Sequence, residues 1–407
     1  MKADRELILV VNGGSSSIKF AVFEAALAPR TVVTGAIESI GLSNAIFRVH
    51  ALSVEKSFDK SVIAQTYIEA TNLLLAWIQK NEACRKITAI GHRVVHGGSK
   101  YSKPVLLTTR VIDELKKVTS IDREHMPNEI LLMTSLMHLF PSLKQVACFD
   151  TEFHQLMPLV ARLLPIPRRY ETLGIRRYGF HGLSYEFLLD ELGRTCGLEA
   201  SKSRIVFAHI GSGVSLAAVR DGKCIDTSMS FTPNSGVPMA TRSGDLDPGL
   251  APYLALAEGL SPKDFNEMVN FNSGLFGMSE VTSDMRVLLE REAYDSRSAD
   301  AVAVFCYRIK KCIGEFASAL GGIDTLVFSG GIGERAPTIR AKICEDLQFL
   351  GIEIDPDKNT RNELLVSLPD GRVSVHVIHT DEELMIAKKV WQIAFANEQE
   401  HSLAVKE

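Results

Sequence analysis

The sequence predicts an α/β protein with two domains. Apolar runs of strand length alternate with segments of helical apolar spacing along the chain. A chain of 407 residues is also too long for one ordinary hydrophobic core, so two domains are expected. A turn of glycine and serine that leads into an apolar run occurs once in each half, at 14–22 and at 211–219. This similarity indicates two related halves, unless two hairpin turns resemble one another by chance.

The first half is predicted to alternate strands and helices. Two apolar runs, 7–11 and 18–23, flank a cluster of glycine and serine and predict the two strands of a hairpin. The elements expected after this hairpin are a helix over 61–80, a strand over 87–95, a helix over 127–140 and a strand over 145–149.

The second half follows a linker rich in proline and arginine at 158–177. The elements expected there are a helix near 184–196, a strand over 204–210, a hairpin over 214–226, a long helix over 298–320, a strand over 325–329, a helix from 337 and a strand over 373–378. The hairpin is predicted to turn at Asp221-Gly222. A capping box at 380–383, in which Glu383 bonds back to the start of its helix, predicts a last helix over 380–395.

Composition excludes several classes of partner. A net charge of −4 and a pI near 6.3 provide no basic surface for nucleic acid or anionic lipid. No stretch approaches the roughly 18 consecutive apolar residues that a membrane span requires. The seven cysteines are odd in number, scattered and without a Cys-x-x-Cys pair, so we expect free thiols and a reducing, cytoplasmic compartment.

Candidate chemistry begins at the first glycine cluster. Gly13 and Gly14 let the backbone approach an anion closely. The hydroxyls of 15–17 then supply neutral donors to phosphate oxygens, with Asn12 and Lys19 at the edges. The alternative is a flexible surface turn. The common signatures of P-loop, dinucleotide-binding, zinc-protease and serine-hydrolase sites are absent.

Two apolar strands end in charged residues. Arg93 lies among the histidines and glycines of 91–98, where it can make forked hydrogen bonds to a carboxylate or phosphate, or a structural ion pair. Asp150 directly follows the strand at 145–149, which is where open α/β sheets keep catalytic groups. Its carboxylate can hold Mg²⁺ through water, or it can cap the next helix.

Three further stretches combine glycines with polar side chains. His181 lies between glycines and aromatic residues, as either a catalytic group or a structural histidine. Arg242 lies in the polar loop 241–249 and is a second candidate anion clamp, the alternative being a solvated loop. The turn at 328–334 suits close packing against a purine or ribose, with helix N–H groups facing phosphate.

Together these stretches resemble the acetokinase family of acetate and propionate kinases, within the actin/hexokinase/Hsp70-like ATPase fold. The resemblance extends from Val10 to Ala387 and rests on 12–19, GHRVVHGG at 91–98, FDTEFH at 149–154, RRYGFHG at 176–182, DTSMSFTP at 226–233, TRSGDLDP at 241–248, GGIGE at 330–334 and TDEELMIA at 380–387. It implies duplicated ribonuclease H-like domains around a cleft. The lobes it implies are an acceptor-side lobe at 1–150 plus 385–407 and a nucleotide-binding lobe at 151–384.

The resemblance also implies an activity and a set of site residues. The γ-phosphoryl group of ATP passes reversibly to acetate, with Mg²⁺ or alternatively Mn²⁺, giving acetyl phosphate and ADP in a cytoplasmic homodimer. The residues that match the family's reaction centre are Arg93, Asp150, His181, Arg242 and His125. The residues that match its metal ligands are Asn12, Asp150 and Glu382, with Glu382 facing the cleft. The residues that match its ATP site are Asn12, Ser17, Lys19, His209, Gly211, Gly213, Asp284, Arg286, Gly331 and Ile332. Those that match the pocket for the alkyl tail of the acid are Val95, Phe180 and Pro233.

Several positions depart from the family's pattern. Glu124 replaces an apolar pocket residue, Tyr185 replaces a histidine, and Ser212 replaces an amide of the phosphate turn. Further departures are at Ser99, Met126, Leu183, Asn234, Ser235 and Ala240. They leave nucleotide preference and acceptor size open, so propionate or another short-chain acid is an alternative acceptor, although Val95 leaves a small pocket that favours acetate. A non-catalytic paralogue and an ATP-driven binding protein are the alternatives from other classes.

Overall fold

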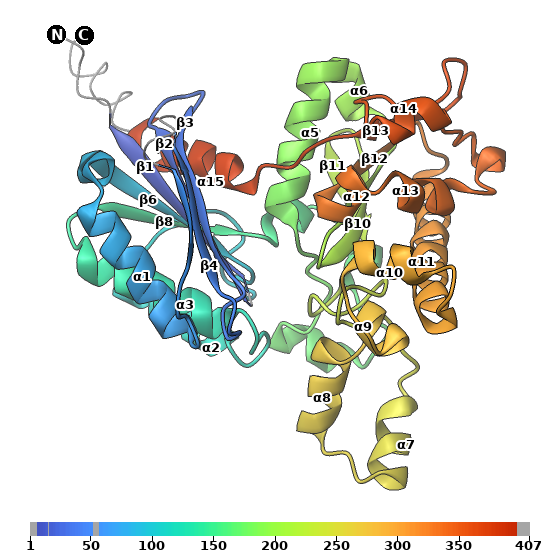
Figure 1. The fold of residues 1–407 in the computed structure, drawn as a ribbon, viewed down its shortest axis with the longest axis horizontal. Coiled ribbons are helices and arrows are strands. Elements are labelled where there is room, and N and C mark those ends of the chain that lie inside the picture. The colour runs from blue at the N-terminus through green and yellow to red at the C-terminus, as the bar shows by residue number, and fades with distance from the viewer. Residues whose placement is uncertain (1–5, 15, 52–56, 397–407) are drawn as a thin grey trace. The chain divides into compact units, whose positions relative to one another are not determined.

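The computed structural model describes residues 6–14, 16–51 and 57–396. The chain divides into two compact units, Met1–Glu152 with Asp381–Glu407 and Phe153–Thr380 (Figure 1). Residues 381–384 therefore belong with the first unit, because Asp381 caps the helix that packs on the first sheet. Ser15, one of the expected hydroxyl donors of the first glycine turn, lies outside the described residues.

The first unit is built on an eight-stranded sheet in the order β5-β4-β3-β2-β1-β6-β8-β7. The strands are β1 (Leu7–Gly13), β2 (Ile18–Glu24), β3 (Thr31–Glu38), β4 (Ile46–Ala51), β5 (Phe58–Ser61), β6 (Ile87–Val94), β7 (Val105–Leu106) and β8 (Lys144–Phe149). β1 and β2 form the predicted antiparallel hairpin, in which Val11 pairs with Phe20. β1, β6 and β8 run parallel, so their carboxyl ends lie at the same edge of the sheet.

Helices cover both faces of this sheet. They are α1 (Tyr67–Lys80), α2 (Thr109–Val118), α3 (Met126–Leu139) and α15 (Glu382–Trp391). Leu9 of β1 belongs to a hydrophobic cluster with Leu74 of α1 and Leu132 of α3. α15 packs on the opposite face, against β1 and β6 (Figure 1). Successive residues of a strand point to opposite faces, so a strand covered on both faces reads as a continuous apolar run, as β1 does.

The second unit is built on a five-stranded sheet in the order β11-β10-β9-β12-β13. Its strands are β9 (Ile205–Ile210), β10 (Val214–Arg220), β11 (Lys223–Thr227), β12 (Thr325–Ser329) and β13 (Ser374–Val377). β9, β10 and β11 are antiparallel neighbours, and β12 and β13 continue parallel to β9. The β10–β11 hairpin turns at the predicted Asp221-Gly222, where both residues have positive φ, as a tight two-residue hairpin turn requires.

The two sheets share one strand plan. In the first unit the order β3-β2-β1-β6-β8 contains an antiparallel run followed by two strands parallel to β1. The order β11-β10-β9-β12-β13 repeats it in the second unit. The similar glycine and serine turns fall at the corresponding places, between β1 and β2 and between β9 and β10. The sequence similarity between the halves therefore reflects a duplicated α/β fold rather than chance.

The helices of the second unit surround its sheet. They are α4 (Leu159–Arg162), α5 (Gly182–Cys196), α6 (Leu198–Lys202), α7 (Leu250–Ala257), α8 (Pro262–Phe271), α9 (Gly274–Ser279), α10 (Met285–Arg291), α11 (Ser296–Leu320), α12 (Gly330–Arg335), α13 (Pro337–Cys344) and α14 (Pro356–Thr360). Short helical turns in the chain are η2 (Glu82–Lys86), η3 (Glu152–His154), η4 (Arg168–Leu173), η5 (Gln348–Leu350) and η6 (Gln392–Ala396). Among the residues that the structure describes, no helix has the length and apolar character needed to cross a membrane.

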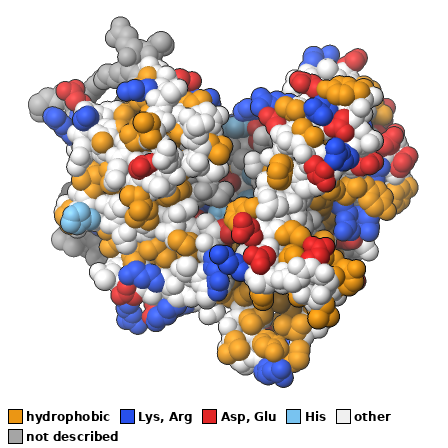
Figure 2. Space-filling view, turned by 60° about the horizontal axis from the view of Figure 1, so that its bottom comes forward, with side chains coloured by type: hydrophobic (Ala, Val, Ile, Leu, Met, Phe, Trp, Pro, Cys, Tyr) orange, Lys and Arg blue, Asp and Glu red, His pale blue; other side chains and the backbone are white. Residues whose placement is uncertain are grey.

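α7 differs from the other long helices because it has no buried residue. Tyr253 and Leu256 are 65% and 89% exposed, and hydrophobic side chains gather at the surface around α7 and α8 (Figure 2). The sequence of α7 is almost wholly apolar, which is typical of a helix that is covered by another surface.

The first expected helix starts later than the spacing predicts. Residues 58–61 form the edge strand β5, and α1 begins at Tyr67. Thr66 and Glu69 form a capping box there, so the hydroxyl and carboxylate satisfy the first backbone N–H groups of the helix. The apolar residues of 61–66 share the helical period but precede this cap.

Gly91 sets how closely α15 packs on the first sheet. A Cβ atom at this position would lie 2.5 Å from Cγ2 of Ile386 and 2.7 Å from Cγ2 of Val390. We expect Gly91→Ala to push α15 outward and to lower the free energy of unfolding by about 1–3 kcal/mol. Urea titration of the purified protein measures this change.

Gly314 provides the matched control for this prediction. It lies within α11, and no atom lies within 4 Å of the position that its Cβ would take. Gly314→Ala should leave packing unchanged and raise stability by up to about 1 kcal/mol, because alanine favours the helix. Equal effects of the two substitutions would contradict the role assigned to Gly91.

Candidate functional site

In the first unit, three neighbouring parallel strands bring polar side chains to one edge of the sheet. Asn12 lies near the end of β1, Arg93 near the end of β6, and Asp150 directly after β8. The first turn of α15 adds Glu382 beside them. This edge is where the strand order predicts catalytic groups in an α/β sheet.

Arg93 lies at the centre of a group that we call the carboxylate cluster, namely Arg93 with Glu129, Asp150 and Glu382. Its Nη2 donates to Oδ2 of Asp150 at 2.5 Å. Its Nη1 lies 3.8 Å from Oε1 of Glu129, and its Nε lies 3.8 Å from Oε2 of Glu382. The structural ion pair considered for Arg93 is therefore present, and Asp150 holds this arginine rather than capping the turn that follows.

Burial disfavours the ionised form of the carboxyl groups in this cluster. Burial raises the pKa of the Asp150 carboxyl, Arg93 opposes this effect, and Glu382 adds to it. Burial also raises the pKa of Glu129 to about 8, although Arg93 acts against the rise. One guanidinium thus faces three carboxyl groups, so the cluster holds an excess of negative charge that only a proton or a further cation can offset.

The donor set at this edge fits a Mg²⁺ ion. Oδ1 of Asp150 is buried and has no hydrogen-bond partner among the described residues. Among those residues, no group of three or more His, Cys, Asp or Glu side chains is arranged to hold a metal by itself. Mg²⁺ differs from zinc in this respect, because it commonly uses one or two carboxylates and completes its shell with water and substrate phosphate oxygens. Asp150, Glu382 and the amide of Asn12 match that requirement.

The start of α15 departs from the expected capping box. Asp381, not Thr380, caps the helix, and its carboxylate accepts from the N–H of Leu384. Glu383 is instead bound by Asn12, whose Nδ2 donates to Oε1 of Glu383 at 3.0 Å and to Oε2 of Glu382 at 3.2 Å. The expectation for Glu383 was wrong because a side chain distant in sequence competes successfully with the local helix terminus.

The remaining predicted residues of the first unit lie around this edge. His125 donates from Nδ1 to Asp122 at 3.1 Å, and its charge acts on Asp150. Although burial raises the pKa of Asp122, hydrogen bonds from His125 lower it to about 2. The N–H of Val95 donates to Oε2 of Glu129 at 3.0 Å. Of the two predicted phosphate contacts beside the first turn, Lys19 is exposed on β2 and Ser17 is partly exposed just before that strand.

In the second unit, His181 and Arg242 converge on the turn between β9 and β10. A Cβ atom at Gly213 would lie 3.2 Å from Nε2 of His181 and 3.7 Å from Nη1 of Arg242. His181 precedes α5 with φ of 58°, a strained backbone for a non-glycine residue that is common at functional sites. Arg242 is held by the carbonyl of Pro233, which accepts from Nη1 at 3.3 Å.

His209, at the end of β9, lies against His181. The two ring centroids are 4.4 Å apart and the planes are inclined by 32°. Nδ1 of His209 bonds the hydroxyl of Ser184 at 2.9 Å, and that hydroxyl also bonds Thr380 at 2.8 Å. His181, His209 and Arg242 thus bring ring and guanidinium nitrogens around one glycine turn.

The predicted adenosine residues lie in two places. A Cβ at Gly211 would come 3.9 Å from the backbone N of Gly331, so α12 begins beside the second glycine turn, with Ile332 in its first turn. Asp284 caps α10 and pairs with Arg286 at 2.6 Å near the surface. For the described residues, no hydrogen bond or ion pair joins this pair to Gly331 or Ile332.

Phe180 is one of the three residues predicted to enclose the alkyl tail of the acid. It is buried, and its carbonyl accepts a hydrogen bond from His154.

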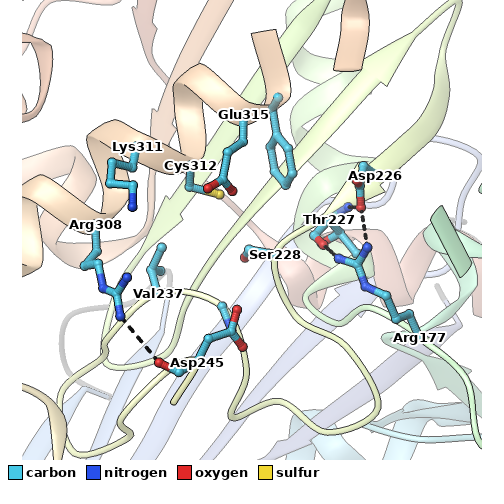
Figure 3. Close-up of a pocket in the computed structure, with 12 residues that line it drawn as sticks. Arg177, Asp226, Thr227, Ser228, Val237, Asp245, Arg308, Lys311, Cys312 and Glu315 are labelled. Atoms are coloured by element: carbon cyan, nitrogen blue, oxygen red, sulfur yellow. Dashed lines mark hydrogen bonds and ion pairs between the residues drawn. The ribbon is translucent and has the colours of Figure 1, made fainter. Parts of the chain in front are cut away.

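The second unit also contains a cavity of about 230 Å³ that none of the predicted residues lines (Figure 3). It lies between α11 and the loop that leads to Arg242, and its walls are Arg177, Asp226, Thr227, Ser228, Gly236, Val237, Asp245, Arg308, Lys311, Cys312, Glu315 and Phe316. Arg177 pairs with Asp226 at 2.9 Å, and Arg308 donates to the carbonyl of Asp245 at 3.4 Å. Basic and acidic side chains are balanced there, so this cavity offers no excess charge to a nucleotide.

Sequence inspection missed Glu129, although a signal was present. The buried stripe of α3 runs through Met126, Glu129, Leu132, Met133 and Leu136. A carboxyl group at the helical period of a buried stripe has to be paired or protonated. The missed groups that orient the histidines, Asp122, Ser184 and Ser215, carry no comparable local signal.

The raised pKa of Glu129 makes stability depend on pH. The unfolded chain releases this proton near pH 4.5 and the folded chain near pH 8. Between these values the folded state holds a proton that the unfolded state has lost, so stability falls as the pH rises, by up to about 1.4 kcal/mol per unit. Glu129→Gln should therefore be more stable than the parent at pH 8 and should lose less stability between pH 5 and pH 8, as measured by urea unfolding.

Glu199→Gln is the control for this measurement. The Glu199 side chain is 91% exposed and, within the described part of the chain, pairs only with Lys202 on the surface, so its replacement should leave the pH dependence unchanged. If Glu129→Gln and Glu199→Gln follow the same curve, Glu129 is ionised in the folded protein at neutral pH.

Comparison with known proteins identifies the family of this chain. The model of the acetokinase family matches residues 7–388. Acetate kinase of Rhodopseudomonas palustris is 40% identical over 401 residues, which cover 96% of this chain and 98% of that protein. Propionate kinase of Citrobacter rodentium is 40% identical over 394 residues, which cover 96% of this chain and 97% of that protein.

Solved structures show the same relationship. The crystal structure of Porphyromonas gingivalis acetate kinase matches with a TM-score of 0.84 and 35% identity, covering 96% of this chain and 100% of that one. A propionate kinase from Francisella tularensis matches with a TM-score of 0.87 and 36% identity, covering 94% and 98%. Sequence and fold thus agree over nearly the full length of each relative, and this chain belongs to the acetokinase family.

Proposed function

We infer that the protein transfers the γ-phosphoryl group of ATP reversibly to acetate, giving acetyl phosphate and ADP. The observation that carries this inference is the convergence of His181 and Arg242 on the glycine turn at 211–213. Together they present a cation and a ring N–H donor beside a backbone turn, which is the combination that a transferring phosphoryl group requires. Membership of a family of acetate and propionate kinases supports the same reaction.

The chemistry needs no general base. A carboxylate oxygen of acetate attacks the γ-phosphorus, a new P–O bond forms, and the bond to the oxygen bridging to the β-phosphate breaks to release ADP. Acetate is already ionised at neutral pH, so no proton has to leave it. The obstacle is the repulsion between an anionic acceptor and a polyanionic donor, which positive side chains reduce.

Each side chain of the proposed reaction centre has its own role in this scheme. Arg242 binds the transferring group, and His181 donates a hydrogen bond to the same group in the transition state. Arg93 attracts the acceptor carboxylate, with His125 nearby, while its ion pairs with Asp150 and Glu382 hold its guanidinium in one orientation.

Mg²⁺ belongs to the proposed reaction. Asp150, Glu382 and Asn12 would hold it. The buried Oδ1 atom of Asp150 has no hydrogen-bond partner among the described residues, which supports this assignment. When bound, the ion neutralises charge on the phosphate oxygens of ATP. Mn²⁺ prefers the same oxygen ligands and is an alternative.

The other predicted residues bind the rest of the two substrates. Ser17, Lys19, His209, Gly211 and Gly213 would contact the phosphates, and Asp284, Arg286, Gly331 and Ile332 the adenosine. Val95, Phe180 and Pro233 would enclose the methyl group of acetate. A methylene changes binding by only about 1–3 kcal/mol in such a pocket, so propionate should also react.

A hydroxamate assay tests the activity directly. The purified protein is incubated with ATP, Mg²⁺ and hydroxylamine together with acetate, propionate or butyrate. We expect acetate to give the highest kcat/KM, propionate a lower value, and EDTA to abolish the product. Product with propionate alone would assign the alternative acceptor, and no product with any of the three acids would favour a non-catalytic paralogue.

Arg242→Ala isolates one catalytic contribution. Nη1 of Arg242 donates to the carbonyl of Pro233 and lies near the sulfur of Met239. We expect kcat to fall on the order of 10³-fold or more, since a positioned arginine contributes this much in phosphoryl transfer. Arg194→Ala, which removes an exposed side chain paired with Glu191, should retain full activity. Activity of Arg242→Ala near the parent level would contradict the role of Arg242.

We extend the proposal to a cytoplasmic homodimer. All seven cysteines are free thiols, which suits a reducing compartment. The exposed apolar helix α7 offers an apolar surface that a second copy would cover. An exposed apolar helix without a partner would favour aggregation.

Charge placed on α7 tests this assembly. Leu256→Asp should convert the dimer to a monomer, measured by light scattering after gel filtration, because an aspartate cannot be buried unpaired at an interface. Leu27→Asp is the control, since Leu27 is 71% exposed in the first unit, far along the chain from α7. A dimer that survives Leu256→Asp would exclude α7 from the interface.

A further inference from the structure

Two hydroxyl groups form a hydrogen-bonded chain that ends at Nδ1 of His181. Its Nδ1 lies 2.9 Å from Oγ of Ser215 on β10. The same Oγ is hydrogen-bonded to the phenol oxygen of Tyr185. Tyr185 lies one turn after His181 in α5, where its backbone N–H donates to the carbonyl of His181. One helix turn therefore carries both ends of the chain Tyr185–Ser215–His181.

The direction of these hydrogen bonds follows from Tyr185. Its side chain is fully buried and packs against the rings of Phe153, His154 and Phe207. Burial raises the pKa of this phenol well above its ordinary value, so the phenol keeps its proton. Ser215 is the only hydrogen-bond partner of the phenol among the described residues. Tyr185 must therefore donate to Ser215, because a buried donor without an acceptor is costly.

The hydroxyl proton of Ser215 then needs an acceptor. Its oxygen accepts from Tyr185, and its only other side-chain partner among the described residues is Nδ1 of His181. The serine hydroxyl thus donates to Nδ1, which must be an unprotonated acceptor. The single ring proton of a neutral His181 then resides on Nε2, the nitrogen beside Gly213.

His209 lies against the same ring, so a charge on both rings is disfavoured. Its ring centroid lies 4.4 Å from that of His181, and two imidazolium ions at this distance would repel one another. Its own Nδ1 also bonds a serine hydroxyl, that of Ser184. The two neighbouring rings are therefore oriented by separate serines.

We propose that Tyr185, acting through Ser215, is a positioning residue that holds His181 as the neutral Nε2–H tautomer, ready to donate to the transferring phosphoryl group. This assignment rests on the function proposed above. No proton is transferred in this role, since His181 only lends a hydrogen bond. Tyr185 replaces a histidine of the family's pattern, and its phenol donates to Ser215 because no other acceptor for its proton lies among the described residues.

Nitrogen NMR of the ligand-free protein tests the tautomer. The protein is labelled with ¹⁵N-histidine, and the His181 ring is assigned by its loss in His181→Gln. We expect a protonated Nε2 and an unprotonated Nδ1 in the parent, and a mixture of tautomers in Tyr185→Phe. Tyr178→Phe is the matched control, because its hydroxyl bonds the carbonyl of Gly174 and not the histidine pair. A His181 spectrum that Tyr185→Phe leaves unchanged would overturn the proposal.

Steady-state kinetics test the consequence for transfer. Tyr185→Phe keeps the packed ring, so the fold should persist and KM for ATP should stay within about twofold, while kcat falls about 10-fold, as is typical when an outer hydrogen-bond partner is removed. In a Ser215→Ala background the same change should have no further effect, because the connection is already broken. Additive losses in the double variant would show that Tyr185 acts through packing instead and would overturn the relay.

The two measurements separate this proposal from the proposed function. If the parent forms no acetyl phosphate and the NMR result holds, the orientation of His181 is supported and the assigned reaction is wrong. If the parent is active and the tautomer does not depend on Tyr185, the reaction stands and the relay is wrong.

Discussion

The ion pairs of Arg93 are the interaction on which the candidate site of the first unit depends. One guanidinium is shared by Asp150, Glu129 and Glu382, which come from β8, α3 and α15. Each of these elements must dock correctly for the arginine to be neutralised, so the site and the core of this unit are assembled together. Because acidic groups outnumber the arginine, the cluster favours one more positive charge, which a divalent cation would supply in the function proposed above.

The two units of the duplicated fold differ in the charge of the side chains around their glycine turns. Both present a glycine turn at the end of a central strand, but their surroundings differ in sign. The first turn lies among carboxylates that suit a cation, whereas the turn at 211–213 lies among His181, His209 and Arg242, which suit an anion. Phosphoryl transfer uses both kinds of environment, one that suits a cation and one that suits an anionic group.

Hydrogen-bond direction refines this division in the second unit. Histidine offers either ring nitrogen as a donor, so a site that needs one particular donor has to specify it. Tyr185 and Ser215 specify the donor of His181. Among the described residues, the phenol proton has only Ser215 as its acceptor, and the serine proton has only Nδ1 of His181 as a side-chain acceptor. In this proposal, the substitution of a family histidine by Tyr185 thus retains a constraint on the orientation of His181.

Local sequence was sufficient to predict most of the helices and strands, and the polar residues that project from their ends. Strand ends, glycine turns and the hairpin at Asp221-Gly222 depend on neighbours in the chain, which is why Arg93, Asp150 and His181 could be singled out. The partners of these residues could not be inferred in the same way. Glu383 bonds Asn12 across 371 positions, and Glu129 reaches Arg93 only after α3 packs on the sheet. Such contacts are set by long-range packing, since it is the docked helix, and not the local pattern, that determines which polar group a buried side chain meets.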